Sequence, residues 1–293
     1  MVIEPNAQDM KHGTGADCPV VELRQYTLRP GQRDILIDLF DRAFIESQEA
    51  LGMGIIGQFR DLDNPDRFVW LRGFRDMPAR AEALAAFYDG PVWNAHRDVA
   101  NATMVDSENV LLLCPARPAS GFSPDGSARP PHGAREIPEG IVVATIYYLA
   151  APACADFVDY FERSLWPLLA DAGASILAYF VTERSANTFP RLPVRAGEQV
   201  FVWFARFRDQ ADYDHHREAL AQSRQWRGEV TDALARRFAA PPEVVTLSPT
   251  ARSYAARQYR ALPRSCAGQA PPSGFPTTTK APCSLTSTTE SAS

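Results

Sequence analysis

A strand-like segment near the start of the chain carries three side chains that could bind or balance charge. In VVELRQYTL, side chains alternate between two faces, so Glu22, Arg24 and Tyr26 share one face. A guanidinium beside a phenol can hold a carboxylate, an enolate or a phenolate through charge-assisted hydrogen bonds. The pattern is equally typical of an ion pair between Glu22 and Arg24 that needs no ligand.

A second segment, FVWLRGFRD, adds an arginine between aromatic residues, because Trp70 and Arg72 alternate onto one face. If the two faces meet, Arg24 and Arg72 oppose a single Glu22. A buried arginine is costly unless it is paired, so this site would keep surplus positive charge. We therefore expect an anionic or enolisable small molecule between Arg24, Tyr26 and Arg72, or a carboxylate from the rest of the chain that neutralises the surplus.

One histidine is suited to proton transfer. His96 follows Trp93 by three residues, which puts the two on nearly the same face of a helix. Imidazole titrates near neutral pH and can act as a general acid or base, although a histidine at the edge of an amphipathic helix is often only solvated. His96 is the candidate catalytic residue, and the candidate ligand-binding residues are Glu22, Arg24, Tyr26, Trp70, Arg72 and Trp93.

No cofactor or metal is expected. His215 and His216 are adjacent, hence about 100° apart on a helix, and Asp212 with His216 offers only two ligands at a useful spacing. This segment is predicted to be solvated helix surface. The surroundings of His96 are not specific for haem, no Gly-rich phosphate loop opens a helix, and the five scattered cysteines form no CxxC pair.

The elements that must position these residues follow from hydrophobic periodicity. An amphipathic helix begins at Gln32 and ends before Gly52, and the other elements alternate between strand-like and helical composition. The order strand, helix, strand, strand, helix, strand is the ferredoxin-like arrangement. The predicted strands are Val20 to Leu28, Ile55 to Arg60, Phe68 to Phe74 and Val110 to Leu113, and the later helices are Met77 to Tyr88 and Val92 to Met104.

The same order occurs twice. FVWLRGFRD returns as FVWFARFRD 133 positions later, and this offset also superposes Trp93 on Trp226. Ile141 to Leu149 repeats the first strand at an offset of 121. The second copy therefore carries extra residues, which fall within Glu183 to Gln199. The chain is predicted to be one module built twice.

Composition limits the class of protein. The chain of 293 residues has 30 basic and 35 acidic residues, a net charge of -5 and no basic block, which argues against nucleic acid as the main partner. There is no apolar run of a membrane span and no signal-peptide core at the start. We expect a cytoplasmic protein that spans no membrane.

Domain boundaries follow from the repeat and from composition. Residues 20–115 and 141–249 are the two modules, and residues 116–140, rich in Pro, Gly, Ser and Ala, are a linker that lets them dock in more than one way. Residues 1–19 are expected to be a frayed leader. The tail, residues 250–293, becomes rich in Ser, Thr and Pro, cannot bury enough apolar surface, and is expected to be disordered.

Two stretches resemble the NIPSNAP family. VVELRQYTLRPG with its following helix, then GIIGQFRDLDNPDRFVWLRGFRDMPAR and a Trp-containing helical segment, is similar to that family across residues 20–115. The similarity is fainter across residues 141–249, where Ala150-Ala151-Pro152 replaces the Arg-Pro-Gly turn. It implies a dimeric α+β barrel, here formed by two ferredoxin-like modules of one chain that pack sheet to sheet, with further homo-oligomers open. It implies no agreed activity: family members are binding or adaptor proteins, and distant barrel relatives include cofactor-free monooxygenases and isomerases.

Such a barrel predicts which faces point inward. The face with Val21 and Leu23 should meet the helices, which leaves the face of Arg24 inside the barrel with Trp70. The second copy has neutral residues in place of Glu22 and Arg24, so a ligand is expected in the first copy. Large Trp side chains of both copies should be buried.

Two functions of different classes remain. One is a small-molecule-binding or adaptor protein. The other is a cofactor-free enzyme, of monooxygenase or isomerase type, acting on a small anionic or enolisable aromatic or apolar molecule in the first module, with Arg24, Tyr26 and His96 around it. An enclosed cavity of a few hundred Å3 beside Arg24 and Tyr26 would favour the second.

Overall fold

A computed structural model describes residues 18–123, 128–153, 155–254 and 261–263. The leader up to residue 17 and most of the tail, for which disorder is expected, lie outside the described residues. Residues 250–254 are described, and they contact the first half. Arg252 is buried and pairs with Glu46, and the Ser253 hydroxyl accepts a hydrogen bond from the Gln58 amide at 3.1 Å.

The first half alternates strands with helices as its periodicity predicts. The first helical segment contains one turn of π-helix, and it ends at Gly52, which adopts φ +85°, a conformation that glycine adopts without strain. Asp76 caps the next helix by accepting a hydrogen bond from the Ala79 amide at 2.6 Å. The elements are β1 Val20–Leu28, α1 Arg33–Leu39, the π-helical turn Phe40–Phe44, α2 Ile45–Glu49, β2 Gly54–Asp61, β3 Arg67–Phe74, α3 Met77–Tyr88, α4 Pro91–Thr103, the short β4 Met104–Asp106 and β5 Val110–Pro115.

The second half repeats this order down to its irregularities. A π-helical turn recurs at Phe161–Leu165, Gly173 ends the helical segment with φ +102°, and Asp209 caps the next helix through the Asp212 amide at 2.8 Å. The elements are β6 Ile141–Tyr148, α5 Ala155–Tyr160, the π-helical turn, α6 Trp166–Asp171, β7 Ser175–Thr182, β8 Val200–Phe207, α7 Gln210–Gln222, a second π-helical turn Trp226–Val230, α8 Thr231–Ala235 and β9 Glu243–Pro249.

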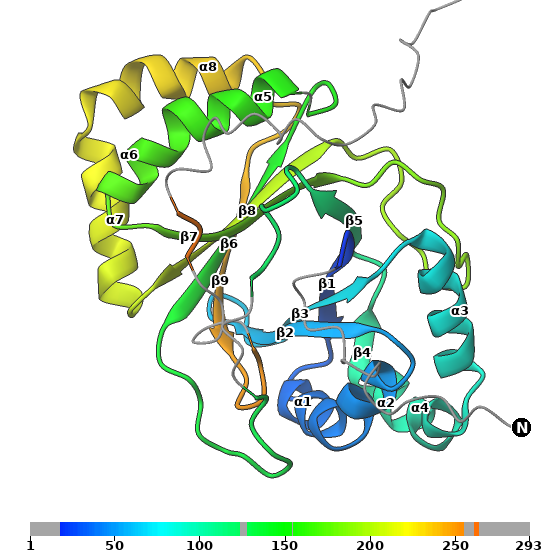
Figure 1. The fold of residues 1–293 in the computed structure, drawn as a ribbon. Coiled ribbons are helices and arrows are strands. Elements are labelled where there is room, and N and C mark those ends of the chain that lie inside the picture. The colour runs from blue at the N-terminus through cyan, green and yellow to red at the C-terminus, as the bar shows by residue number, and fades with distance from the viewer. Residues whose placement is uncertain (1–17, 124–127, 154, 255–260, 264–293) are drawn as a thin grey trace, which may run out of the picture.

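The strands close into one barrel. Antiparallel pairing runs β1-β3-β2-β9-β6-β8-β7-β5 and returns to β1, while β4 adds to β1 outside this ring. The two halves meet at β2 with β9 and at β5 with β7. Their helices cover opposite outer sides of the barrel (Figure 1). The prediction of one intramolecular barrel is therefore confirmed.

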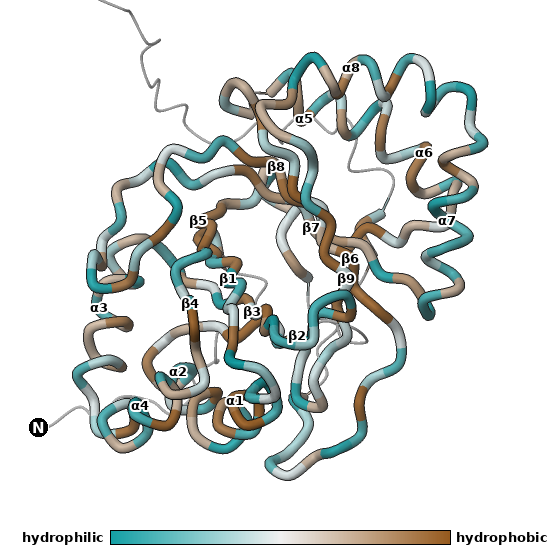
Figure 2. Tube along the Cα trace, turned by 180° about the vertical axis from the view of Figure 1, so that it is seen from behind, coloured by the Kyte–Doolittle hydropathy of each residue, from teal (hydrophilic) through white to brown (hydrophobic). Residues whose placement is uncertain are grey.

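The barrel interior is aliphatic and aromatic, which reverses the predicted faces of β1 and β3. Val21 and Leu23 pack inside with Leu71 of β3 and with Leu177 and Phe204 of the second half. The hydrophobic colouring of the strands in Figure 2 follows this shared core. A small closed barrel is filled by side chains from every strand and offers a charged group few partners, so the apolar face faces inward.

The described parts of the linker are bound to both halves, where composition predicted a flexible tether. Phe122 is buried and its ring lies 5.5 Å from that of Phe180 and 5.0 Å from that of Phe204. Arg129 donates to Glu49 at 2.5 Å and to the Ile55 carbonyl at 2.7 Å. These contacts restrict how the halves can dock.

The extra loop of the second half reaches the first half. Phe189 is buried against the first-half core and stacks on Tyr88, with ring centroids 5.9 Å apart. The Thr188 hydroxyl donates to the Met77 carbonyl at 3.0 Å, and Arg191 pairs with Asp89 at 2.7 Å. The loop thus covers α3.

Candidate functional site

A charged cluster lies between the sheet and the helices of the first half. Glu22 Oε2 accepts hydrogen bonds from Arg24 Nη1 and Arg72 Nε, both at 2.8 Å, and Glu22 Oε1 accepts from Arg80 Nε at 2.7 Å. Arg24 Nε also donates to the Tyr26 hydroxyl at 2.9 Å. The structure thus brings the predicted residues of β1 and β3 together, but on the helix side of the sheet and not inside the barrel.

Burial and charge set the protonation states of this cluster. Burial opposes ionisation of Glu22, yet the guanidiniums of Arg72, Arg24 and Arg80 outweigh it and hold the pKa of the Glu22 carboxyl far below its ordinary value. Burial raises the pKa of Tyr26, so its phenol stays protonated. Glu22 is therefore ionised and fully engaged as an acceptor.

Some of the remaining donors of the cluster find neutral partners, whereas Arg72 Nη2 and Arg80 Nη2 are buried without a hydrogen-bond partner among the described residues. Arg72 Nη1 donates to Gln48 Oε1 at 3.0 Å, and Arg80 Nη1 donates to Asn187 Oδ1 at 2.9 Å, which comes from the loop of the second half. Arg72 also lies over the Trp70 ring, 5.0 Å from its centroid. The second half thus contributes an amide oxygen here rather than the carboxylate considered from the sequence.

The first half has no room for a small molecule beside this cluster. The adjoining cavity measures about 20 Å3 and is lined by residues that include Tyr26, Gln48, Trp70 and Trp93. That volume suits about one water molecule. Trp70 Nε1 is buried and has no hydrogen-bond partner among the described residues, so a water there would find a donor.

His96 lies apart from the cluster. It is half-buried on α4, with its ring 6.2 Å from that of Phe44, and it does not line the small cavity. Trp93 does line the cavity, among Phe44, Phe87 and Tyr88. The structure therefore places Trp93 with the other candidate residues and separates His96 from them.

The equivalent place in the second half is a pocket of about 440 Å3. Tyr147, Trp203 and Trp226 line it at the positions that Tyr26, Trp70 and Trp93 occupy in the first half. Smaller residues replace three members of the charged cluster, while Tyr213 stands in place of Arg80. Val143, Thr145 and Ala205 stand where the first half has Glu22, Arg24 and Arg72, and Leu169 stands where it has Gln48.

This pocket is apolar with a few polar groups. No aspartate or glutamate is among the described residues that line it. The Trp203 side chain is buried within hydrogen-bonding range of the Tyr147 phenol, and Thr145 adds a hydroxyl. Burial raises the pKa of Tyr147 to about 12, so its phenol is neutral. A volume of this size, mostly apolar with few placed donors and acceptors, is typical of small-molecule sites.

His216 belongs to this pocket, which corrects the prediction of a solvated helix surface. Only 3% of it is exposed, and its ring packs 4.9 Å from that of Phe207. Its Nδ1 lies 3.0 Å from the Ala172 carbonyl oxygen, just past the end of α6. A carbonyl can only accept, so Nδ1 carries the proton and Nε2 is left as an acceptor. Burial lowers the pKa of His216 and keeps the imidazole neutral.

Sequence reasoning missed Arg80, Gln48 and His216. The sequence carried a signal for Arg80 and for His216. Arg80 falls in the buried stripe of α3 with Met77 and Leu84, and His216 precedes the buried Leu220 by four residues. A polar residue at a core position of an amphipathic helix is the pattern to search for. Gln48 carried no comparable signal.

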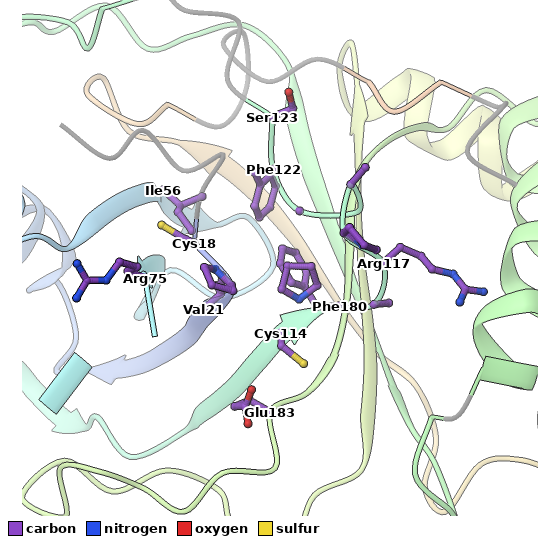
Figure 3. Close-up of a pocket in the computed structure, with 16 residues that line it drawn as sticks. Cys18, Val21, Ile56, Arg75, Cys114, Arg117, Phe122, Ser123, Phe180 and Glu183 are labelled. Carbon is purple, nitrogen blue, oxygen red and sulfur yellow. The ribbon is translucent and has the colours of Figure 1, made fainter. Parts of the chain in front are cut away.

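A larger cleft of about 790 Å3 opens at one end of the barrel (Figure 3). Its walls include Cys18, Phe122 and Phe180, and the side chain of Arg117 points away from it toward the second half, where it binds Glu162 at 3.1 Å. Burial raises the pKa of Cys114 to about 11, so this thiol is not a nucleophile near neutral pH.

The described residues contain neither a cluster of metal ligands nor a helix that could span a membrane. No three His, Cys, Asp or Glu side chains there are grouped so as to hold a metal ion. Across that same part of the chain, every helix is too short or too polar to cross a membrane.

Comparison with known proteins finds a family match in the first half. The sequence model of the NIPSNAP family matches residues 21–118, which lie in the first half. No functionally curated protein matches the sequence. A NIPSNAP family protein from Agrobacterium tumefaciens is 25% identical and covers 33% of this chain and 92% of its own, with a TM-score of 0.31.

Two solved structures match both halves. A "putative monooxygenase" from Lactobacillus acidophilus NCFM is 12% identical, with a TM-score of 0.51, and the match covers 84% of this chain and 100% of its own. An anthrone oxidase-like protein is 13% identical, also with a TM-score of 0.51, over 83% of this chain and 98% of its own. At these identities the likeness shows a shared fold.

Proposed function

We propose that the chain is a small-molecule-binding protein whose ligand occupies the second-half pocket between β6, β8 and the helices α7 and α8. We interpret its two halves as tandem ferredoxin-like modules, in keeping with the repeated element order, of which the second has become the binding module. The proposal therefore moves the ligand from the first half, where the sequence placed it, to the second.

The observation that carries this proposal is the difference in volume at equivalent positions. The second-half pocket measures about 440 Å3 and the first-half cavity about 20 Å3. Apolar side chains that border an empty pocket lose contacts that a well-packed core would supply, and an apolar ligand restores them. Aromatic walls from Tyr147, Trp203, Trp226 and Phe238 suit a flat, largely apolar molecule.

The alternative, a cofactor-free enzyme acting in the first half, has less support. Glu22 accepts from both Arg24 and Arg72, Tyr26 accepts from Arg24, and the adjoining cavity holds about one water. The two fold relatives are named after oxidation reactions, and these names concern only those two proteins. Binding is the function that this geometry supports.

Ligand binding is testable with N-phenyl-1-naphthylamine, a neutral probe whose emission rises in apolar surroundings. We expect the protein to bind it, and we expect Val143→Phe, which fills the pocket floor, to weaken binding at least about tenfold, since a ligand of this size cannot share the volume. Ala240→Phe adds the same ring at an exposed site outside the pocket and should change nothing. Equal affinity in Val143→Phe and the parent protein would refute the site.

A complementary measurement needs no chosen probe. Native mass spectrometry of protein purified from its own host should show an added small mass that Val143→Phe loses and Ala240→Phe keeps. A retained mass in Val143→Phe would place the ligand elsewhere.

A further inference from the structure

The polar groups around the second-half pocket restrict the chemistry of its occupant. His216 offers an acceptor at Nε2, because its Nδ1 proton is held by the Ala172 carbonyl at 3.0 Å. No described residue donates a hydrogen bond to Nε2. Nε2 is not among the buried atoms that lack a partner, so water can reach it, and a ligand hydroxyl that donates to Nε2 would replace that water.

The groups that face His216 favour a neutral donor over a cation. From its own helix they are Asp212, Tyr213 and Arg217, and from β6 Tyr147. Arg217 lines the rim and is the only charged residue among the described lining residues. Its charge is exposed and offset by Asp214 at 3.8 Å, so the apolar walls of the pocket, more than this charge, disfavour an ammonium group.

Resting on the proposed function, we infer that the ligand of the second-half pocket is a hydroxylated aromatic molecule whose hydroxyl donates a hydrogen bond to His216 Nε2. A phenol is neutral near pH 7, as tyrosine is, and it joins a flat apolar body to one strong donor. The body matches Trp203, Trp226 and Phe238, and the donor matches the free nitrogen. The Thr145 hydroxyl remains for a second oxygen on the same ligand.

Naphthalene, 1-naphthol and 1-methoxynaphthalene test the inference, because the last two differ in whether the oxygen can donate. We expect 1-naphthol to bind about fivefold more tightly than 1-methoxynaphthalene at pH 7.5, the effect of one hydrogen bond. His216→Asn keeps an amide donor near the place of Nδ1 and removes Nε2, so it should abolish the preference while naphthalene still binds. His215→Asn, at the exposed neighbouring residue, should keep the preference.

A pH series provides a second measurement that needs no variant. Protonated imidazole has no acceptor, so the preference for 1-naphthol should vanish as the pH falls through the pKa of His216. Burial lowers that pKa from 6.5, so the preference should persist at pH 6.5 and be lost only in more acidic solution.

The outcomes separate the two proposals. If none of the three compounds binds, the proposed function is wrong, and this inference falls with it. If naphthalene binds but 1-naphthol is not preferred, or if the preference survives both His216→Asn and acid, the pocket binds apolar molecules and the role of His216 is wrong.

Discussion

The two halves of this molecule use the same place between sheet and helices in opposite ways. In the first half, Glu22 and three arginines fill the space and leave about 20 Å3, while in the second half small residues leave about 440 Å3. The surrounding aromatic frame is retained, since Trp70 and Trp203 occupy equivalent strands. The two halves thus differ in that one has a charged, closed core and the other an open, apolar one.

This difference shows that buried charge need not mark a binding site. The sequence predicted that arginines bind the ligand. In the structure, Arg72 donates hydrogen bonds to Glu22 and Gln48, and Arg80 donates one to Asn187. The Asn187 contact belongs to the extra loop of the second half, so the cluster also links the halves. The empty volume lies where the sequence is least charged.

Removing the central carboxylate, Glu22, should lower the stability of the protein most severely. We expect Glu22→Gln to lower the free energy of unfolding by about 3 to 5 kcal/mol, because three buried guanidiniums lose their counter-charge. Asp34→Asn, which disrupts the exposed pair with Arg60, is the control and should cost less than about 1 kcal/mol. Chemical denaturation measures both, and similar values would show that the buried cluster is unimportant for stability.

The paired tryptophans offer the next largest effect. Trp70→Ala should cost about 3 to 5 kcal/mol, since the ring is 1% exposed and packed by side chains of the cluster. Trp203→Ala should fall at the lower end of that range, because part of its ring already borders a pocket. Urea denaturation of the two variants decides the order, and a larger loss for Trp203→Ala would contradict the difference in packing.

Acid should weaken the first half through Glu22. Its folded pKa lies below the ordinary value of 4.5, so this group contributes stability that is fully present above about pH 5 and is lost as the pH falls toward the folded pKa. Thermal unfolding from pH 6 to pH 3 should show this loss, and Glu22→Gln should reduce the slope. An unchanged slope in the variant would assign the acid sensitivity to other carboxylates.

Filling the second-half pocket should have the smallest effect on stability. Leu220→Phe introduces the residue that the first half has at the equivalent Phe87, and we expect a change below about 1 kcal/mol because the pocket accepts the ring. Leu84→Phe, at a fully buried site of the first half, should cost about 1 to 3 kcal/mol. Equal costs in calorimetry would mean that the pocket is not free volume.

Much of the fold could be predicted because local signals were strong. The bounds of β1 and α3 match their predicted ranges, since alternation, helical periodicity and the Asp76 cap agree there. The repeat predicted the barrel. The short β4 was missed, because three residues carry no periodicity.

The candidate site was harder to predict because it depends on which face of a strand turns inward. Alternation grouped Glu22, Arg24 and Tyr26 correctly but could not say which side the helices cover. Closure of the barrel decides this, and it is a property of both halves together. An empty volume also has no signature in one segment, because it results from small side chains such as Val143 and Ala205 on different strands.

The indole signals of the five tryptophans test the central claim most directly. A nitrogen-15 correlation spectrum, assigned with single Trp→Phe variants, can be titrated with 1-naphthol, and the duplication supplies its own control. We predict that the signals of Trp203 and Trp226 shift and that those of Trp70 and Trp93 stay in place. Shifts confined to Trp70 and Trp93 would contradict the account, because they would put the ligand in the first half.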